Sequence, residues 1–143
     1  MPSQRDLDLA YLGVAQLHAN LSKALRSKVG ACLVTSTGVI VPGYNGTVGG
    51  ADNACEDTSN GFLVTKPSVL HAELNCILKC SKEGITSEGS TLYLTLSPCE
   101  ACAAMIAQAG IKRVVYAEEY RDKAGIHALD EYNVESEQIK VAV

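Results

Sequence analysis

The chain has 143 residues, of which 47% are hydrophobic and 20% charged, and its formal net charge is −4. This length and composition predict one domain, residues 1–143, that buries a substantial core. The acidic balance disfavours a partner such as long nucleic acid. A cytoplasmic protein without membrane contacts is favoured, because no apolar run approaches the ~20 residues of a spanning helix and the first residues lack a signal-peptide layout.

The first half of the chain predicts a helix followed by a hairpin. Apolar residues recur at three- and four-residue intervals from Leu7 to Leu21, which is typical of an amphipathic helix, and its polar face is predicted to carry Asp8. Residues 29–34 and 39–44 are predicted strands, joined by the turn TSTG.

A long loop is predicted over residues 46–69. The segment is rich in Gly, Asp and Asn and shows neither helical nor strand periodicity. Structureless stretches of this length are uncommon in compact domains and are often functional. We therefore expect this loop to overhang the helix that begins near His71.

The second half alternates helices and strands. Helices are predicted over 70–80, 99–110 and 123–132, and strands over 91–96, 113–117 and 138–143. Strand–helix–strand crossovers imply parallel pairing in this half. The expected fold is α/β, a three-layer α/β/α sandwich on a five-stranded mixed sheet.

Six cysteines need an explanation, since disulfides are rare in a reducing cytosol. Cys32, Cys76 and Cys80 lie in apolar segments, where a free thiol behaves as a small buried hydrophobe. Cys99 and Cys102, three residues apart in PCEAC, fit a metal site, a redox pair or a disulfide.

The metal interpretation gains support from a second helix start. Cys99 and Cys102 follow Pro98 at one predicted helix start, and His71 stands at another. Three ligands that leave a fourth position for water are typical of a catalytic zinc, which lowers the pKa of that water. Glu73 would stand beside the metal without binding it, where a carboxylate accepts and donates protons.

These residues carry a resemblance to a known family. H-x-E followed by P-C-x-x-C is the signature of zinc deaminases. Over nearly its whole length the sequence resembles that superfamily, and more narrowly the deoxycytidylate (dCMP) deaminases, in VGACLV, GVIVPGYNG, HAELNCIL, TLYLTLSPCEAC, AQAGIKRVVY and EEYRD. The resemblance implies a cytidine deaminase-like fold and zinc-dependent hydrolysis of dCMP to dUMP. A deaminase of another cytosine or adenosine substrate, and a non-catalytic zinc nucleotide sensor, stay open as alternatives.

The resemblance also implies roles for individual residues. His71, Cys99 and Cys102 would hold one zinc ion, and Glu73 would activate the water that attacks C4 of the cytosine. The remaining substrate contacts would be Ala72 at the base edge, Asn45 at the deoxyribose hydroxyl and Tyr120 beside the sugar and base. Ser22, Lys23 and Arg26, at the basic end of the first predicted helix, are candidates for the 5′-phosphate, with Arg121 as a rival.

Regulation and assembly are implied by the same resemblance. Members of the family are typically homo-oligomers, often hexamers, that dCTP activates and dTTP inhibits, and a triphosphate effector would bring Mg²⁺. The effector site would comprise Tyr44, Gly46, Thr47, Gly49, Gly50 and Asn53. Val48 stands where we expect a proline in this family, so the shape of the loop departs from the family pattern there. Cys55, in the same loop, leaves a second zinc site open.

Overall fold

A five-stranded mixed sheet organises the protein, whose computed structural model describes residues 1–141. Its strands, in spatial order, are β2 (Ile40–Tyr44), β1 (Gly30–Val34), β5 (Thr91–Leu96), β6 (Arg113–Glu118) and β7 (Glu135–Gln138). β1 runs antiparallel to β2 and β5, whereas β5, β6 and β7 run parallel to one another. The central strands are hydrophobic and buried on both faces, as strands between two helical layers must be.

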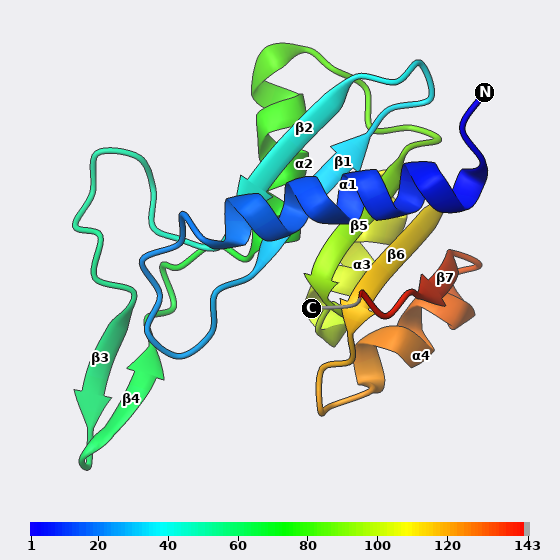
Figure 1. Cartoon of the computed structure of the whole chain (residues 1–143). Coiled ribbons are helices and arrows are strands. Elements are labelled where there is room, and N and C mark those ends of the chain that lie inside the picture. Colours follow the sequence, from blue (N-terminus) through cyan, green and yellow to red (C-terminus); the bar gives the residue numbers. More distant parts are fainter. Residues whose placement is uncertain (142–143) are drawn as a thin grey trace.

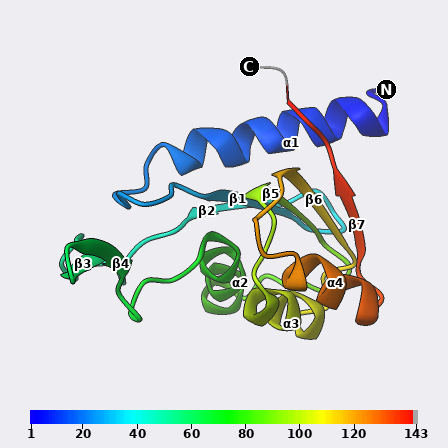
Figure 2. The ribbon, with the colours of Figure 1, turned by 90° about the horizontal axis from the view of Figure 1, so that it is seen from below.

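Helices cover both faces of this sheet. One face carries α1 (Gln4–Ala19), and the other carries α2 (Ala72–Glu83), α3 (Glu100–Gln108) and α4 (Ala124–Glu131), as Figures 1 and 2 show. This arrangement confirms the predicted three-layer α/β/α sandwich on a five-stranded mixed sheet. Among residues 1–141, no helix is both long enough and apolar enough to cross a membrane.

The two helical layers approach the sheet closely at two glycines. A Cβ added at Gly30 would lie 1.8 Å from the carbonyl oxygen of Ala15, so α1 rests directly on β1 there. On the opposite face, a Cβ at Gly43 would lie 2.9 Å from the Sγ of Cys76 in α2. Cys32, Cys76 and Cys80 are all buried, which confirms that they pack as small hydrophobes.

The helix α1 forms where it was predicted, but it buries a different face. Ser3 caps it in a capping box with Asp6. The buried residues are Asp8, Leu12, Ala15 and Ala19. Leu17 is 68% exposed, and Leu21, which lies beyond the helix, is 53% exposed. The prediction that Asp8 lies on a polar outer face is therefore wrong.

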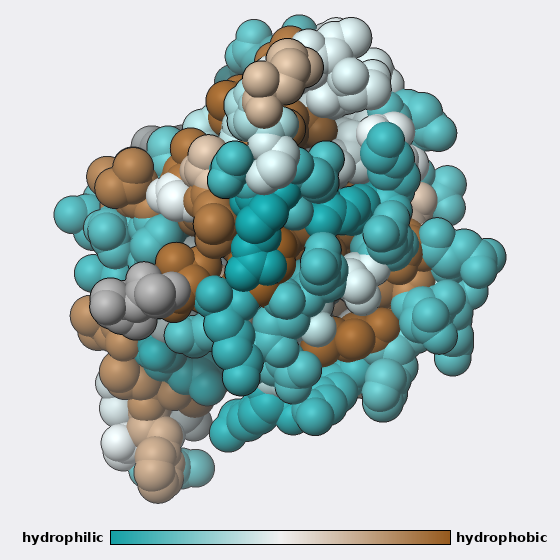
Figure 3. Space-filling model, turned by 45° about the vertical axis from the view of Figure 1, so that its right-hand side comes forward, coloured by the Kyte–Doolittle hydropathy of each residue, from teal (hydrophilic) through white to brown (hydrophobic). Residues whose placement is uncertain are grey.

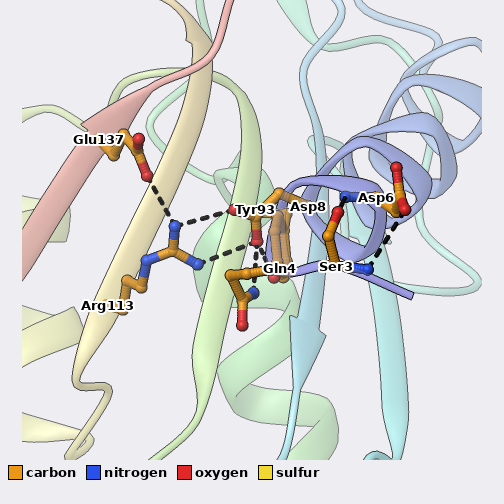
Figure 4. A network of polar contacts seen from close by, with 7 residues as sticks. All are labelled: Ser3, Gln4, Asp6, Asp8, Tyr93, Arg113 and Glu137. Carbon is orange, nitrogen blue, oxygen red and sulfur yellow. Dashed lines mark hydrogen bonds and ion pairs between the residues drawn. The ribbon is translucent and has the colours of Figure 1, made fainter. Parts of the chain in front are cut away.

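The burial of Asp8 has a clear physical cause (Figure 4). Its carboxylate accepts two hydrogen bonds of 2.9 Å from the guanidinium of Arg113, one of 2.7 Å from the hydroxyl of Tyr93 and one of 2.9 Å from Gln4. Arg113 also pairs with Glu137 at 2.7 Å. A buried carboxylate is tolerated when its charge is paired and its lone pairs are occupied, as they are here.

A second hairpin interrupts the segment predicted to be a loop. β3 (Glu56–Ser59) and β4 (Phe62–Thr65) pair antiparallel around Asn60 and Gly61, both of which have positive φ. An Asn-Gly pair with this geometry is the preferred two-residue hairpin turn. The hairpin projects from the body of the molecule (Figure 1), and its surface is partly hydrophobic (Figure 3). The prediction of a structureless 46–69 segment is thus wrong for residues 56–65.

The last strand is also shifted from its predicted place. β7 comprises the polar residues 135–138, and only Gln138 overlaps the predicted strand 138–143. Its exposed and half-buried residues alternate, as expected for an edge strand rich in charge. Ile139 is buried beyond the end of β7, and Val143 lies outside the described residues.

Candidate active site

The predicted metal ligands, Glu73 and several predicted substrate contacts gather at one edge of the sheet. The carboxyl ends of β5 and β6 meet the amino end of β1 here, and the backbone N–H of Gly30 donates to the Thr95 hydroxyl at 3.1 Å. In α/β sheets, ligands bind outside the carboxyl ends of the strands. A pocket of about 430 Å³ opens at this edge, and its volume suits a small molecule.

The starts of two helices bring together three side chains that could bind a metal ion. His71 is the N-cap residue of α2 and Cys99 is the N-cap residue of α3, and neither side chain makes a capping hydrogen bond. Cys102 follows three residues into α3. The Nδ1 of His71 lies 3.2 Å from the Sγ of Cys102 and 3.7 Å from the Sγ of Cys99. All three donor atoms lie within 4.8 Å of one another.

The environment favours the ionised form of one thiol. Hydrogen bonds from Cys102 and His71 lower the pKa of the Cys99 thiol to about 4. Hydrogen bonds to Cys99 and Glu73 raise the pKa of His71 to about 10. The pKa of Cys102 is raised, because its thiol is hydrogen-bonded to Cys99 and is buried. The thiolate is the form of cysteine that binds metal, and the N-terminus of a helix favours this negatively charged form.

This donor set fits zinc. Zinc prefers nitrogen and sulfur ligands in a tetrahedron, and three protein ligands leave a fourth position open. The side chain of His71 is 51% exposed, so the cluster faces the pocket rather than the closed core. Within residues 1–141, this is the one group of three potential ligands that lies so close together, and Cys55 is not part of it. Cys55 instead packs with Ala24 and Val69.

Glu73 lies beside the cluster in the first turn of α2. It is 4% exposed, and its Oε1 lies 3.6 Å from the Nδ1 of His71. It lines the pocket together with Ala72, whose side chain is fully buried. A buried carboxylate at this place has access to the metal site and to any ligand in the pocket, but little contact with bulk water.

Most of the other predicted contact residues border the same pocket. Asn45, Tyr120, Arg26 and Arg121 all line it. The Asn45 side chain accepts a hydrogen bond from the N–H of Val29 and donates one to the carbonyl of Ser27. An amide retains one acceptor and one donor position after two such bonds, so Asn45 is rigidly held and still able to bind a ligand.

Other predicted residues lie outside the pocket lining. Ser22 is buried, and its hydroxyl donates to the carbonyl of Asn45 at 2.8 Å and accepts from the N–H of Ala24. Lys23 is exposed on the surface. Neither Ser22 nor Lys23 is among the described residues that line the pocket. The same is true of the six predicted effector residues, Tyr44, Gly46, Thr47, Gly49, Gly50 and Asn53.

Glu56, Thr65 and Ser97 are among the pocket residues that the sequence did not predict. Glu56 and Thr65 come from the unpredicted hairpin, one from each of its strands. Ser97, in the SPC sequence, accepts a 2.7 Å hydrogen bond from the N–H of Tyr120. The Asn-Gly turn could have revealed the hairpin, whereas no sequence signal indicates the contact of Ser97.

One imidazole and two thiols beside a carboxylate outside the ligand set form the arrangement of zinc-dependent deaminases. The sequence comparison agrees with this class. The chain belongs to the family described as "Cytidine and deoxycytidylate deaminase zinc-binding region", whose model matches residues 5–118.

Named relatives fall in the same family. The chain is 42% identical over 122 residues to the deoxycytidylate deaminase of Homo sapiens, covering 78% of this chain and 65% of that protein. It is 40% identical over 128 residues to that of Mycobacterium phage D29, covering 82% and 98%. It is 39% identical over 115 residues to ComE operon protein 2 of Bacillus subtilis, covering 78% and 59%. The chain therefore spans less than two thirds of the human and Bacillus proteins and almost all of the phage protein.

A solved structure has a closely similar fold. The dCMP deaminase from the cyanophage S-TIM5, in complex with dCMP and dUMP, superposes with a TM-score of 0.88 at 41% identity. The alignment covers 96% of this chain and 100% of that chain.

Proposed function

We propose that this protein hydrolyses dCMP to dUMP and ammonia. The observation that carries the proposal is the His71–Cys99–Cys102 cluster beside the buried Glu73, at the wall of a nucleotide-sized pocket. The likeness to a cyanophage dCMP deaminase in complex with dCMP and dUMP supports the choice of substrate. Arg26 and Arg121 on the pocket wall supply the positive charge that a nucleotide phosphate requires.

His71, Cys99 and Cys102 would hold the zinc ion. When bound, zinc acts as a Lewis acid that makes water acidic enough to lose a proton near neutral pH. The protein itself contributes the fixed positions of these ligands, since two helix starts set the backbone on either side of the cluster.

Glu73 would move the protons. Its carboxylate accepts a proton from the water that attacks C4 of the cytosine and delivers it to N3. A second proton from the same water then reaches the amino group, which leaves as ammonia. One carboxylate serves both transfers because it stands beside the cluster at 3.6 Å from His71 and is shielded from bulk water.

The substrate would be oriented by groups around the pocket. The backbone at Ala72 would bind the edge of the base, Asn45 the deoxyribose hydroxyl, and Tyr120 would flank the sugar and base. Asn45 is well suited to this task because hydrogen bonds to Val29 and Ser27 fix its orientation before the ligand arrives.

The proposal extends to regulation and assembly. An effector bound at residues 44–53 would act on the substrate site directly, because Tyr44 and Gly46 flank Asn45 in the chain. We therefore include activation by dCTP with Mg²⁺, inhibition by dTTP, a homo-hexamer and a cytoplasmic location in the proposed function. Hyperbolic kinetics unaffected by either triphosphate would remove the regulatory part.

The deciding experiment is the deamination rate of the zinc-loaded protein on dCMP, deoxycytidine, cytidine and dCTP, each with and without dCTP or dTTP as effector. We expect dCMP to be turned over with the highest kcat/KM. No turnover of dCMP, with zinc bound at one ion per chain, would reassign the site to another base or to a non-catalytic sensor.

A further inference from the structure

Two neighbouring backbone N–H groups converge on one carboxylate oxygen at the pocket. The N–H of Leu25 and the N–H of Arg26 donate to the Oε2 of Glu56 at 2.9 and 3.0 Å. The two donors belong to the connection between α1 and β1, whereas the acceptor is the first residue of β3. Successive N–H groups that point at one place form a concavity that binds anions. In this structure the anion is part of the protein.

This contact borders the pocket of the proposed active site. Arg26 and Glu56 both line it, and the guanidinium of Arg26 donates to the hydroxyl of Thr65 at 3.1 Å. Apart from the metal cluster and Glu73, the charged residues of the lining are Arg26, Arg121 and Glu56. Two arginines attract a phosphate to this wall, and Glu56 is the acidic group that opposes it.

We propose that the N–H groups of Leu25 and Arg26 are an anion subsite for the 5′-phosphate of the substrate, and that Glu56 is a resident competitor which the phosphate displaces. The inference rests on the proposed function, because a nucleoside monophosphate is what brings the phosphate. A nucleoside without phosphate enters the pocket without displacing Glu56. Glu56 therefore sets how strongly the enzyme distinguishes the nucleotide from the nucleoside.

The displacement also reaches the hairpin. Glu56 and Thr65 are hydrogen-bonded to the 25–26 segment, and they are the first and last residues of the β3–β4 hairpin. Phosphate at the subsite removes the two hydrogen bonds of Glu56. Of the three hydrogen bonds between the hairpin and residues 25–26, only the one between Thr65 and Arg26 then remains. Substrate binding is thereby coupled to the attachment of a projecting segment.

The test is a substitution that removes the charge of Glu56 and keeps the shape of its side chain. Glu56→Gln keeps a hydrogen-bond acceptor at the same place, while hydrogen bonds to a neutral acceptor are about half as strong as those to a carboxylate. We expect the dissociation constant of inorganic phosphate, measured by calorimetry on the zinc-loaded protein, to fall about tenfold. The ratio of KM for dCMP to KM for deoxycytidine should fall by a similar factor.

Asp57→Asn is the matched control. It removes the same charge from the next residue of β3, whose side chain is 70% exposed and is not part of the pocket lining. This variant should leave phosphate affinity and the KM ratio as they are in the wild-type protein. Equal changes in both variants would indicate a general charge effect and would overturn the assignment.

Two further outcomes separate the inference from the proposed function. Unchanged or weaker phosphate binding in Glu56→Gln overturns the resident competitor, whatever the substrate is. Wild-type protein that does not deaminate dCMP refutes the proposed function, while the calorimetric comparison still decides whether Glu56 occupies an anion subsite.

Discussion

The buried ion pair between Asp8 and Arg113 gives a sharp prediction about stability. Asp8 is 2% exposed, and its carboxylate is held by Arg113, Tyr93 and Gln4 (Figure 4). Asp8→Asn keeps the shape of the side chain and removes its charge. Arg113 then loses a bidentate partner but keeps Glu137 at 2.7 Å.

The expected cost follows from the burial of both partners. Removing one member of a buried ion pair destabilises a protein by about 3–5 kcal/mol, because the other charge stays buried without its partner. Glu137 still compensates part of the charge of Arg113, so we expect the lower end, about 3 kcal/mol. For a chain of this length that corresponds to a melting temperature lower by about 6–12 °C.

The effect should depend on pH in a defined direction. Burial opposes the charge of Asp8, but the hydrogen bonds from Arg113, Tyr93 and Gln4 outweigh it and hold the pKa below the ordinary value of 3.8. A carboxyl with a lowered folded-state pKa stabilises the fold above its unfolded pKa, and this stabilisation is lost as the pH falls through the folded pKa. The gap between wild type and Asp8→Asn should therefore be widest near neutral pH and shrink below about pH 4.

The assay is urea or thermal unfolding of both proteins from pH 3 to 8, with Asp130→Asn on the exposed surface of α4 as the charge control. Asp130→Asn should stay within about 0.5 kcal/mol of wild type. A loss under about 1 kcal/mol in Asp8→Asn, or a gap that widens toward acid, would refute the reasoning.

Three other predictions concern the site and its support. Glu73→Gln should lower kcat by about 10²–10⁴-fold with one zinc still bound per chain, and metal loss measured alongside the rate would contradict a role in proton transfer alone. Chelation of zinc should lower the melting temperature of wild type reversibly but leave that of His71→Ala nearly unchanged, since a ligand that binds only the folded state stabilises it. Gly43→Ala should cost about 1–3 kcal/mol because its Cβ meets Cys76 at 2.9 Å, whereas Gly13→Ala in α1, where a Cβ meets nothing within 4 Å, should be neutral or stabilising.

The clustering of His71, Cys99 and Cys102 could be predicted from sequence because each of these potential metal ligands stands at a helix start. Pro98 before Cys99, and the apolar spacing after His71, define those starts from a few neighbouring residues. Local signals of this kind hold in the folded protein, because a residue remains the N-cap of its helix wherever that helix packs. The parallel pairing of β5 and β6 then brings the loops after them to one edge.

The predictions that were wrong or missing depend instead on contacts between residues that are far apart in the sequence. The partner of Asp8 is 105 positions away, so an acidic residue that pairs in the core looks in the sequence like a surface residue. The same holds for Glu56, whose hydrogen bonds reach back 30 and 31 residues. The hairpin 56–65 is an intermediate case, because the Asn60-Gly61 turn is a local signal but the strand before it, EDTS, has no apolar alternation.

The strands β5 and β6 connect the Asp8–Arg113 ion pair at one end of the sheet with the hydrogen bonds of Ser97 at the other. Arg113 opens β6 at the edge where Asp8 pairs with it, while Ser97 follows β5 at the opposite edge, next to Pro98 and Cys99. There the N–H of Ser97 donates to the carbonyl of Glu118 at 2.9 Å, and its hydroxyl accepts from the N–H of Tyr120 at 2.7 Å.

Those two hydrogen bonds fix the loop that carries Cys99, a predicted metal ligand, against the loop that carries Tyr120, a predicted substrate contact. Ser97 is itself only 4% exposed, so bulk water competes little with Tyr120 for its hydroxyl. The hydrogen bonds of Ser97, at the carboxyl end of β5, therefore help to set the distance between the His71–Cys99–Cys102 cluster and the Tyr120 side of the pocket.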